Sequence, residues 1–286
     1  MKHFIHLHNK KRFSPVAIVL LLVTLFCTTC SHTSDGPTII PDAVKDVDGN
    51  FYDAVVIGSQ TWMQTNLRTR HFRNGSPIPV GKTYPDAESN SSSPYAYDPS
   101  ETYFPNGYDS KRNGLQYNVY AVIDERGLCP EGWHTPSTEE WGLLIRYAST
   151  RQTGLHEYDI GQNAKALASK TGWTKSPYLG TPGHHPQANN STGFDACPNG
   201  FRPSAYSYTY YYDYPICEHH YSNYTEHDAH VQCASFWVNC LHAVDDPYDW
   251  YYIYIQSDVY NIYFAYEHPK ACLPVRCIKD LETKIE

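Results

Sequence analysis

The chain has 286 residues, of which 41% are hydrophobic and 18% are charged, and its formal net charge is −8. An apolar fraction of this size is sufficient for a folded core. The negative balance excludes proteins that hold nucleic acid through clustered positive charge, so we expect no nucleic-acid partner.

The first 29 residues have the features of a secretory signal peptide. Four basic residues between Lys2 and Arg12 precede an apolar run of eleven residues, from Val16 to Phe26. This run is too short for a helix that crosses a bilayer and has the length of a signal-peptide core. After removal of residues 1–29, the chain holds 18 Lys and Arg against 30 Asp and Glu, a formal charge of −12.

Cys30 follows the small residues Thr28 and Thr29, and this arrangement resembles the end of a bacterial lipoprotein signal. In such proteins the cysteine carries acyl chains and becomes the first mature residue. Each buried methylene contributes about 0.8 kcal/mol, so several chains hold a protein at a lipid bilayer. We predict lipidation of Cys30 and an outer-membrane or cell-surface location. Ordinary secretion with cleavage nearby is the alternative.

The first part of the mature chain contains a tether and a β-hairpin. Residues 30–45 include one glycine and two prolines and are predicted to be flexible, with a single domain over residues 46–282. Phe51–Ile57 is rich in β-branched and aromatic residues, and a short glycine turn separates it from Thr61–Met63. Two such runs around a turn predict a hairpin.

A long insertion follows the hairpin. Residues 81–113 contain almost no aliphatic side chain and are predicted to lie at the surface. Residues 114–123 return to a composition typical of a strand or of a buried segment.

Two helices are predicted in the middle of the chain. Ser137 followed by Glu140 matches a capping box, which marks a helix start. The apolar positions behind it predict one buried stripe; they are Trp141, Leu143, Leu144 and Ala148. A second helix is predicted over residues 162–169, with Ala164, Leu167 and Ala168 facing inward.

Short strands return after Gly193. They are predicted at residues 235–238, 251–255, 260–266 and 274–278. Strands, then helices, then strands in one chain predict an α+β fold, with mainly antiparallel short strands, two helices and long loops.

Four segments together resemble one protein family. They are Tyr52–Leu67 (YDAVVIGSQTWMQTNL), Cys129–Ser137 (CPEGWHTPS) with Glu140-Trp141, Gly193-Phe194 with Asn199–Arg202 (NGFR), and Pro274–Asp280 (PVRCIKD). The chain resembles the Fibrobacter succinogenes major paralogous domain, found mostly in exported lipoproteins of the Bacteroidetes and Fibrobacteres. The resemblance implies a C-type-lectin-like α+β fold whose ends are joined by paired strands. It supplies no catalytic residues.

The resemblance also suggests a disulfide pattern. Cys129 and Cys277 match the family's recurrent pair, which lies before the first helix and on the last strand. A bridge closing about 148 residues stabilises by roughly 5 kcal/mol at most in the chain-entropy model. Two further pairs are predicted, with one thiol left over: Cys240 with Cys272, Cys217 with Cys233, and Cys197 unpaired.

Metal binding and catalysis have weaker signals. Glu218–His230 is dense in potential ligands, yet it lacks a His-Glu-x-x-His motif and a helical pattern, and we predict a solvated insertion. Asp245–Asp249 offers oxygen ligands for calcium. The Glu-Pro-Asn and Trp-Asn-Asp signatures of calcium-dependent sugar binders are missing, so calcium is kept as an alternative and no metal or cofactor is predicted.

We predict no enzyme, because the chain has no Gly-x-Ser-x-Gly elbow.

The 26 tyrosines are the remaining signal. A tyrosine ring stacks on sugar rings or anchors a protein interface at low entropic cost. The predicted ligand contacts are Tyr208, Tyr210, Tyr212, Trp250 and Tyr252. For residues 250–254 a second interpretation stays open, in which the rings fill the core in place of aliphatic side chains.

The sequence therefore predicts a non-catalytic, membrane-anchored lipoprotein of the cell envelope or surface. Its acyl chains would hold it to the lipid bilayer. Aromatic-rich loops, at residues 81–113, 204–234 and 243–252, would bind a glycan or a surface protein. The alternatives are a hydrolase that acts on polysaccharide or protein through Glu218–His230, and a purely structural envelope component.

Overall fold

The computed structural model describes residues 36–81, 92–101, 109–150, 163–200, 233–240 and 250–281, all within the unit Gly36–Glu286. In these described residues, the unit is a mixed α+β structure with three sheets of mostly antiparallel strands and few helices. In the part of the chain that is described, none of the helices has the length and apolar composition needed to cross a membrane.

The fold begins with three consecutive antiparallel strands. They are β1 (Thr38–Lys45), β2 (Phe51–Ile57) and β3 (Gln60–Met63). The predicted hairpin is confirmed, and Gly58 in its turn has a φ of 62°, which glycine adopts without strain. Thr38–Lys45 was predicted as part of the tether; it is instead a strand paired with β2, so the folded unit starts earlier than predicted.

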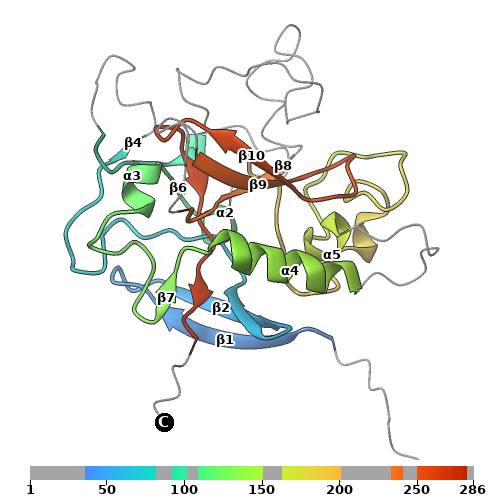
Figure 1. The fold of residues 1–286 in the computed structure, drawn as a ribbon, viewed down its shortest axis with the longest axis horizontal. Helices are drawn as coiled ribbons and strands as arrows, with labels where there is room; N and C mark the ends of the chain where they lie inside the picture. Colours follow the sequence, from blue (N-terminus) through green and yellow to red (C-terminus); the bar gives the residue numbers. More distant parts are fainter. Residues whose placement is uncertain are drawn as a thin grey trace, which may run out of the picture. The chain divides into compact units, whose positions relative to one another are not determined.

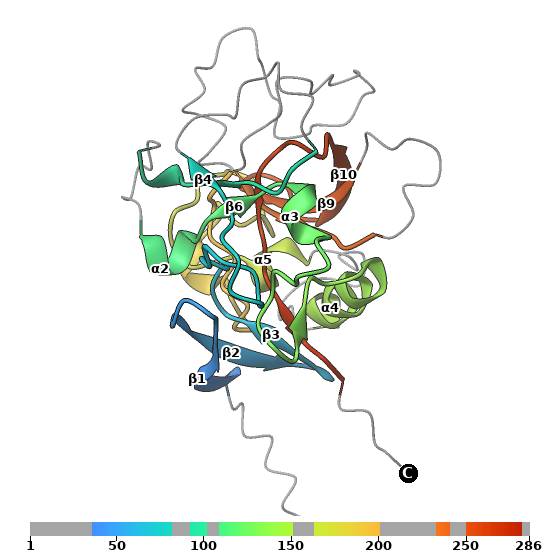
Figure 2. The same cartoon turned by 90° about the vertical axis from the view of Figure 1, so that its left-hand side faces the viewer.

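The first sheet joins the start of the unit to its end. Its strand order is β1-β2-β3-β12-β7, where β7 is Trp133–His134 and β12 is Ile278–Lys279. Ile278 pairs with Trp62 on one side and with His134 on the other. As a result, β1 begins and β12 ends at the same end of the unit (Figure 1, Figure 2).

Helix α4 (Thr138–Thr150) packs between this sheet and the third one (Figure 1). The predicted capping box is confirmed: the Ser137 N–H donates to Glu140 Oε2 at 2.8 Å, and the Glu140 N–H donates to Ser137 Oγ at 3.3 Å. Trp141 lies 4.8 Å from the Trp62 ring and 5.7 Å from the Phe236 ring, centroid to centroid.

Leu143 departs from the predicted stripe. Trp141, Leu144 and Ala148 are buried, but Leu143 is 44% exposed. Two residues after Trp141, a side chain lies about 200° around the helix, so it faces away from the core. The second predicted helix is shorter, as α5 (Ala164–Leu167), and its inward residues are buried as expected.

The second sheet is built from very short strands. Its order is β11 (Leu273–Pro274), β6 (Gln116–Tyr117), β5 (Ala96–Tyr97) and β4 (Val80–Gly81). Two short helical turns, η1 (Pro99–Glu101) and α2 (Ser110–Asn113), connect β5 to β6. Two others lie elsewhere: α3 (Val119–Val122) follows β6, and η3 (Pro186–Ala188) lies between α5 and β8. The strand predicted over residues 274–278 is therefore two strands, in different sheets.

The third sheet separates two hydrophobic cores. Its order is β10 (Tyr263–Glu267), β9 (Trp250–Gln256) and β8 (Cys233–Trp237), all antiparallel. Successive side chains of a strand point to opposite faces. Tyr252 and Tyr254 pack into one core, and Ile253 and Ile255 pack into the other. Burial on both faces explains why β8 and β9 are continuous apolar runs.

The predicted disulfide between Cys129 and Cys277 is present, with an S–S distance of 2.05 Å. It ties the turn that precedes β7 to the residue that precedes β12. The bridge therefore holds β12 in place within the first sheet.

Candidate binding surface at the edge of the third sheet

The strand β10 exposes three aromatic side chains. Tyr263, Phe264 and Tyr266 are 37%, 38% and 57% exposed. In the part of the chain that the structure describes, β10 pairs only with β9, so none of the described strands covers its outer side. We call Tyr263, Phe264 and Tyr266 the aromatic edge.

Two of these rings are fixed by rings of β9. Tyr266 lies opposite Tyr251, with ring centroids 4.5 Å apart and hydroxyl oxygens 3.1 Å apart. Tyr263 lies opposite Tyr254 and stacks on it at 5.8 Å. Direct cross-strand neighbours restrict each other's rotamers. Tyr263 and Tyr266 are therefore held in place before any ligand arrives.

The predicted aromatic residues take different roles. Tyr252 is 1% exposed and packs edge-on against Trp237, with centroids 6.4 Å apart. The Tyr252 ring is part of the hydrophobic core, so the prediction of Tyr252 as a ligand contact was wrong. Trp250 is half-buried and packs against the same core. The predicted contacts Tyr208, Tyr210 and Tyr212 lie outside the described residues.

The aromatic edge itself was missed by the sequence analysis. Residues 260–266 were predicted as a strand without a ligand role. The exposure of β10 follows from its place at the sheet edge, and strand order leaves no local signal in the sequence. The run of aromatic residues was the only available hint.

Two further exposed apolar side chains lie on the loop after α5. Tyr178 and Leu179 are 62% and 74% exposed. The Lys165 ammonium donates to backbone carbonyls of this loop, His185 among them at 3.1 Å, and to Asn189 Oδ1 at 2.8 Å. Burial lowers the pKa of Lys165. A lysine bound in this way fixes the loop from inside.

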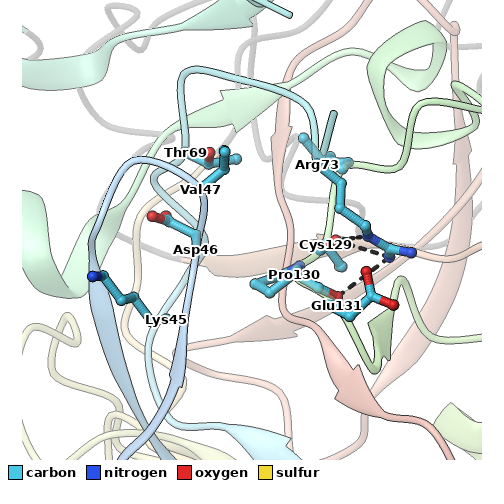
Figure 3. Close-up of a pocket in the computed structure, with 9 residues that line it drawn as sticks. Lys45, Asp46, Val47, Thr69, Arg73, Cys129, Pro130 and Glu131 are labelled. Carbon is cyan, nitrogen blue, oxygen red and sulfur yellow. Dashed lines mark hydrogen bonds between the residues drawn. The ribbon is translucent and has the colours of Figure 1, made fainter. Parts of the chain in front are cut away.

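A pocket of about 250 Å³ lies next to the β1–β2 turn (Figure 3). Lys45, Asp46 and Val47 form one wall, and Arg73 with Cys129–Glu131 forms the other.

The polar groups of this pocket mostly hold the protein together. Asp46 accepts hydrogen bonds from the Tyr52 hydroxyl at 2.6 Å and from the Asn50 N–H at 2.9 Å. Arg73 donates to the Cys129 carbonyl at 2.9 Å and to the Trp133 carbonyl at 3.1 Å. Through these hydrogen bonds, Asp46 and Arg73 hold the two turns that line the pocket.

His134 stands between two carboxylates. Its Nε2 lies 2.9 Å from Glu140 Oε1, and its Nδ1 lies 2.5 Å from Asp280 Oδ1. The bond to Glu140 and then the bond to Asp280 raise the pKa of His134 to about 9, although burial opposes the shift. A general base must be unprotonated near neutral pH. The imidazolium instead links β7, the start of α4 and the end of β12.

Among the described residues, no group of three or more His, Cys, Asp or Glu side chains is arranged so that it could hold a metal ion. The histidine-rich segment Glu218–His230 and the calcium candidate Asp245–Asp249 lie outside that part of the chain. The solvated insertion stays a prediction, and the calcium site stays an alternative.

The remaining cysteines follow the predicted pattern in part. Cys240 and Cys272 are not joined to each other, which corrects that predicted pair. Cys217 lies outside the described residues, so its pairing with Cys233 is untested. Cys197 is a buried thiol as predicted, and burial raises its pKa.

Fold and surface together define an α+β domain with an aromatic strand edge. Residues 55–279 match the model of the Fibrobacter succinogenes major domain. The match covers more than half of the chain, and the protein belongs to this family, as its four motifs predicted. No curated protein and no solved structure shows significant similarity to the chain.

Proposed function

We propose that the protein is a non-catalytic, lipid-anchored binding module of the cell envelope, and that the aromatic edge contacts its ligand. The observation that carries this proposal is the set of three exposed rings on β10, two of them fixed by rings of β9. Aromatic side chains that are already fixed lose little conformational entropy on binding, and they can stack on a sugar ring or pack against a protein surface.

The placement of the edge supports this role. β10 lies at the end of the unit opposite to the start of β1 and the end of β12 (Figure 1, Figure 2). An acyl chain on Cys30 would be six residues from Gly36, a span of about 20 Å at most. The β1 end would then lie nearest to the bilayer, and the aromatic edge would face away from it.

A C-type-lectin-like architecture is part of the proposal. It is supported by the first sheet, which contains both the first strand β1 and the last strand β12, and by the disulfide that ties the turn before β7 to the residue before β12. The hydrolase alternative depends on Glu218–His230 and stays a prediction, as does the purely structural role.

The test uses the mature chain from residue 31 and the variant Tyr263→Ser/Phe264→Ser/Tyr266→Ser. Both are applied to a glycan array and to arrayed envelope proteins. The wild type is expected to retain a ligand, and the variant to bind it at least about tenfold more weakly, since interface aromatic residues often contribute 2 kcal/mol or more. The control Tyr178→Ser/Leu179→Ser removes side chains elsewhere that are even more exposed, and it is expected to bind normally. Failure of the wild type to retain any ligand would contradict the proposal.

A further inference from the structure

The outer side of β10 has the properties of an unprotected strand edge. Edge strands are commonly protected by lysine, proline or a β-bulge. The strand Tyr263–Glu267 contains neither lysine nor proline, and its five residues pair with β9 in continuous register. Within the described residues, no hydrogen bond beyond the β9 ladder engages the backbone of Phe264–Tyr266. A further strand can therefore be added there.

The central residue of β10 is flanked by aromatic side chains. Ala265 has an aromatic residue on each side, Phe264 before it and Tyr266 after it. Phe264 and Tyr266 share one face of the sheet, and Ala265 is on the other. An antiparallel pairing of two such strands about Ala265 would set each Phe264 opposite a Tyr266.

We propose that β10 pairs with β10 of a second copy of this chain, antiparallel and with a two-fold axis at Ala265. The proposal rests on the proposed function, because it names the ligand of the aromatic edge as another copy of the protein. The sheets of the two copies become one continuous sheet of six strands.

The side chains fit this register. Directly opposite residues of an antiparallel pair have Cβ atoms about 4.5–5.5 Å apart, which is within ring contact. Phe264 meets Tyr266 of the partner subunit, and the reciprocal pair forms on the other side of the axis. The small side chain of Ala265 lets the two backbones approach at the axis. A two-fold interface of this kind is closed, so pairing stops at two copies.

The charges permit the contact. Each mature copy has a formal charge of −12, which opposes association at long range. At the seam, Glu267 is the one charged residue of the strand, and it is 5% exposed with its Oε1 accepting a hydrogen bond from the His268 N–H. The seam is otherwise neutral and aromatic. Added salt screens the long-range repulsion, so it strengthens the pairing.

The complex is expected to be weak in solution. Five residues of strand and a few rings form a small interface, and interfaces below about 1,200 Å² are typical of transient complexes. Copies anchored in one membrane or displayed on facing membranes meet at a higher effective concentration.

The first experiment measures self-association of the mature chain by sedimentation velocity over a concentration series. A reversible monomer–dimer equilibrium is expected, shifted towards dimer by added salt. Phe264→Lys/Tyr266→Lys places four charges at the seam and is expected to leave monomer alone. Tyr260→Lys, an exposed tyrosine outside the strand, is the matched control and dimerises as the wild type does. Equal thermal stability of the variants shows that they fold.

The second experiment tests the register. Ala265→Cys places two thiols at the axis, and oxidation is expected to give a disulfide-linked dimer whose peptide map joins residue 265 to residue 265. Tyr263→Cys, opposite Glu267 of the partner subunit, is expected to link several-fold less. Equal linking of the two variants, or a wild type that stays monomeric at every concentration, overturns the proposal.

The outcomes also separate this inference from the proposed function. A monomeric protein whose aromatic edge retains a glycan or another protein defeats the inference and keeps the function. A monomeric protein that retains nothing on the edge defeats both.

Discussion

Arg276 donates two hydrogen bonds to the side-chain oxygen of Asn66, at 3.0 Å from Nε and 2.8 Å from Nη2, across 210 residues of sequence. The guanidinium is 1% exposed and also donates to the Phe194 carbonyl at 2.6 Å. The Phe194 ring lies 4.6 Å from the guanidinium carbon. Burial lowers the pKa of Arg276 to about 10, so the group stays charged at neutral pH. This buried cation joins the segment after β3 to the last strands.

Arg276→Met is expected to destabilise the protein by at least about 3 kcal/mol. The change leaves Asn66 Oδ1 and the Phe194 carbonyl buried without a donor, and each unpaired group costs about 1–3 kcal/mol. Urea unfolding measures the loss. Arg70→Met is the matched control, because Arg70 pairs with Asp98 at a 52% exposed position and such pairs contribute about 0–1 kcal/mol. Similar losses in both variants would contradict the central role of Arg276.

Removal of the Cys129–Cys277 disulfide is expected to cost about 2–5 kcal/mol, because the bridge closes a long loop in the unfolded chain. The measurement is the melting temperature of Cys129→Ala/Cys277→Ala against the wild type under non-reducing conditions. Cys197→Ala, which removes a buried thiol without a bridge, is expected to lose less. Detection of Cys129 as a free thiol in the unreduced protein would refute the prediction.

Local patterns in the sequence predicted the elements that local interactions fix. The hairpin around Gly58 and the capping box of Ser137 and Glu140 depend on residues a few positions apart, and both are present. The motif match also placed the disulfide correctly. Residues 274–278 were wrongly taken as one strand, because Val275 and Cys277 bind the backbone of Leu67 and Met63. That long-range contact has no local signature.

The candidate site was harder to predict for the same reason. The sequence shows that Tyr252 and Tyr266 are aromatic residues of strands, but not which strand lies at the edge. β9 is central and buries Tyr252, whereas β10 is at the edge and exposes Tyr266. Strand order is set by the whole chain, so the exposure of these aromatic side chains could be seen only in the structure.

The His134 ion pairs are expected to make stability fall as pH rises through about 9. The folded-state pKa of His134 is raised to about 9 from an ordinary value of 6.5. The folded protein therefore holds a proton that the unfolded chain has lost, and the stabilisation is full below about 6.5 and lost above about 9. Because the ring is 38% exposed, solvent limits the effect to about 1 kcal/mol at most.

The measurement is the free energy of unfolding at a series of pH values from 6 to 10. His134→Gln keeps a polar side chain at this position and removes the titration. The difference between wild type and variant is expected to shrink steadily across that range. A difference that stays constant with pH would show that the ion pairs do not stabilise the fold.

Lys165→Met is expected to loosen the loop that carries Tyr178 and Leu179. The methionine keeps most of the apolar stem, but the loop carbonyls and Asn189 Oδ1 lose the ammonium donor, with distances of 3.1 Å to the His185 carbonyl and 2.8 Å to Asn189 in the wild type. Buried acceptors without a donor favour local opening, which exposes backbone to proteases and to hydrogen exchange.

Limited proteolysis followed by mass spectrometry locates the opening. Cleavage between residues 178 and 186 is expected to be several-fold faster in Lys165→Met than in the wild type, with little change elsewhere. Lys170→Met is the matched control, since Lys170 is exposed and its loss leaves the loop carbonyls bound. Faster cleavage over the whole domain would point to global destabilisation instead. Unchanged cleavage would mean that the hydrogen bonds of Asn189 to the Ser169 and Pro182 carbonyls are sufficient to hold the loop.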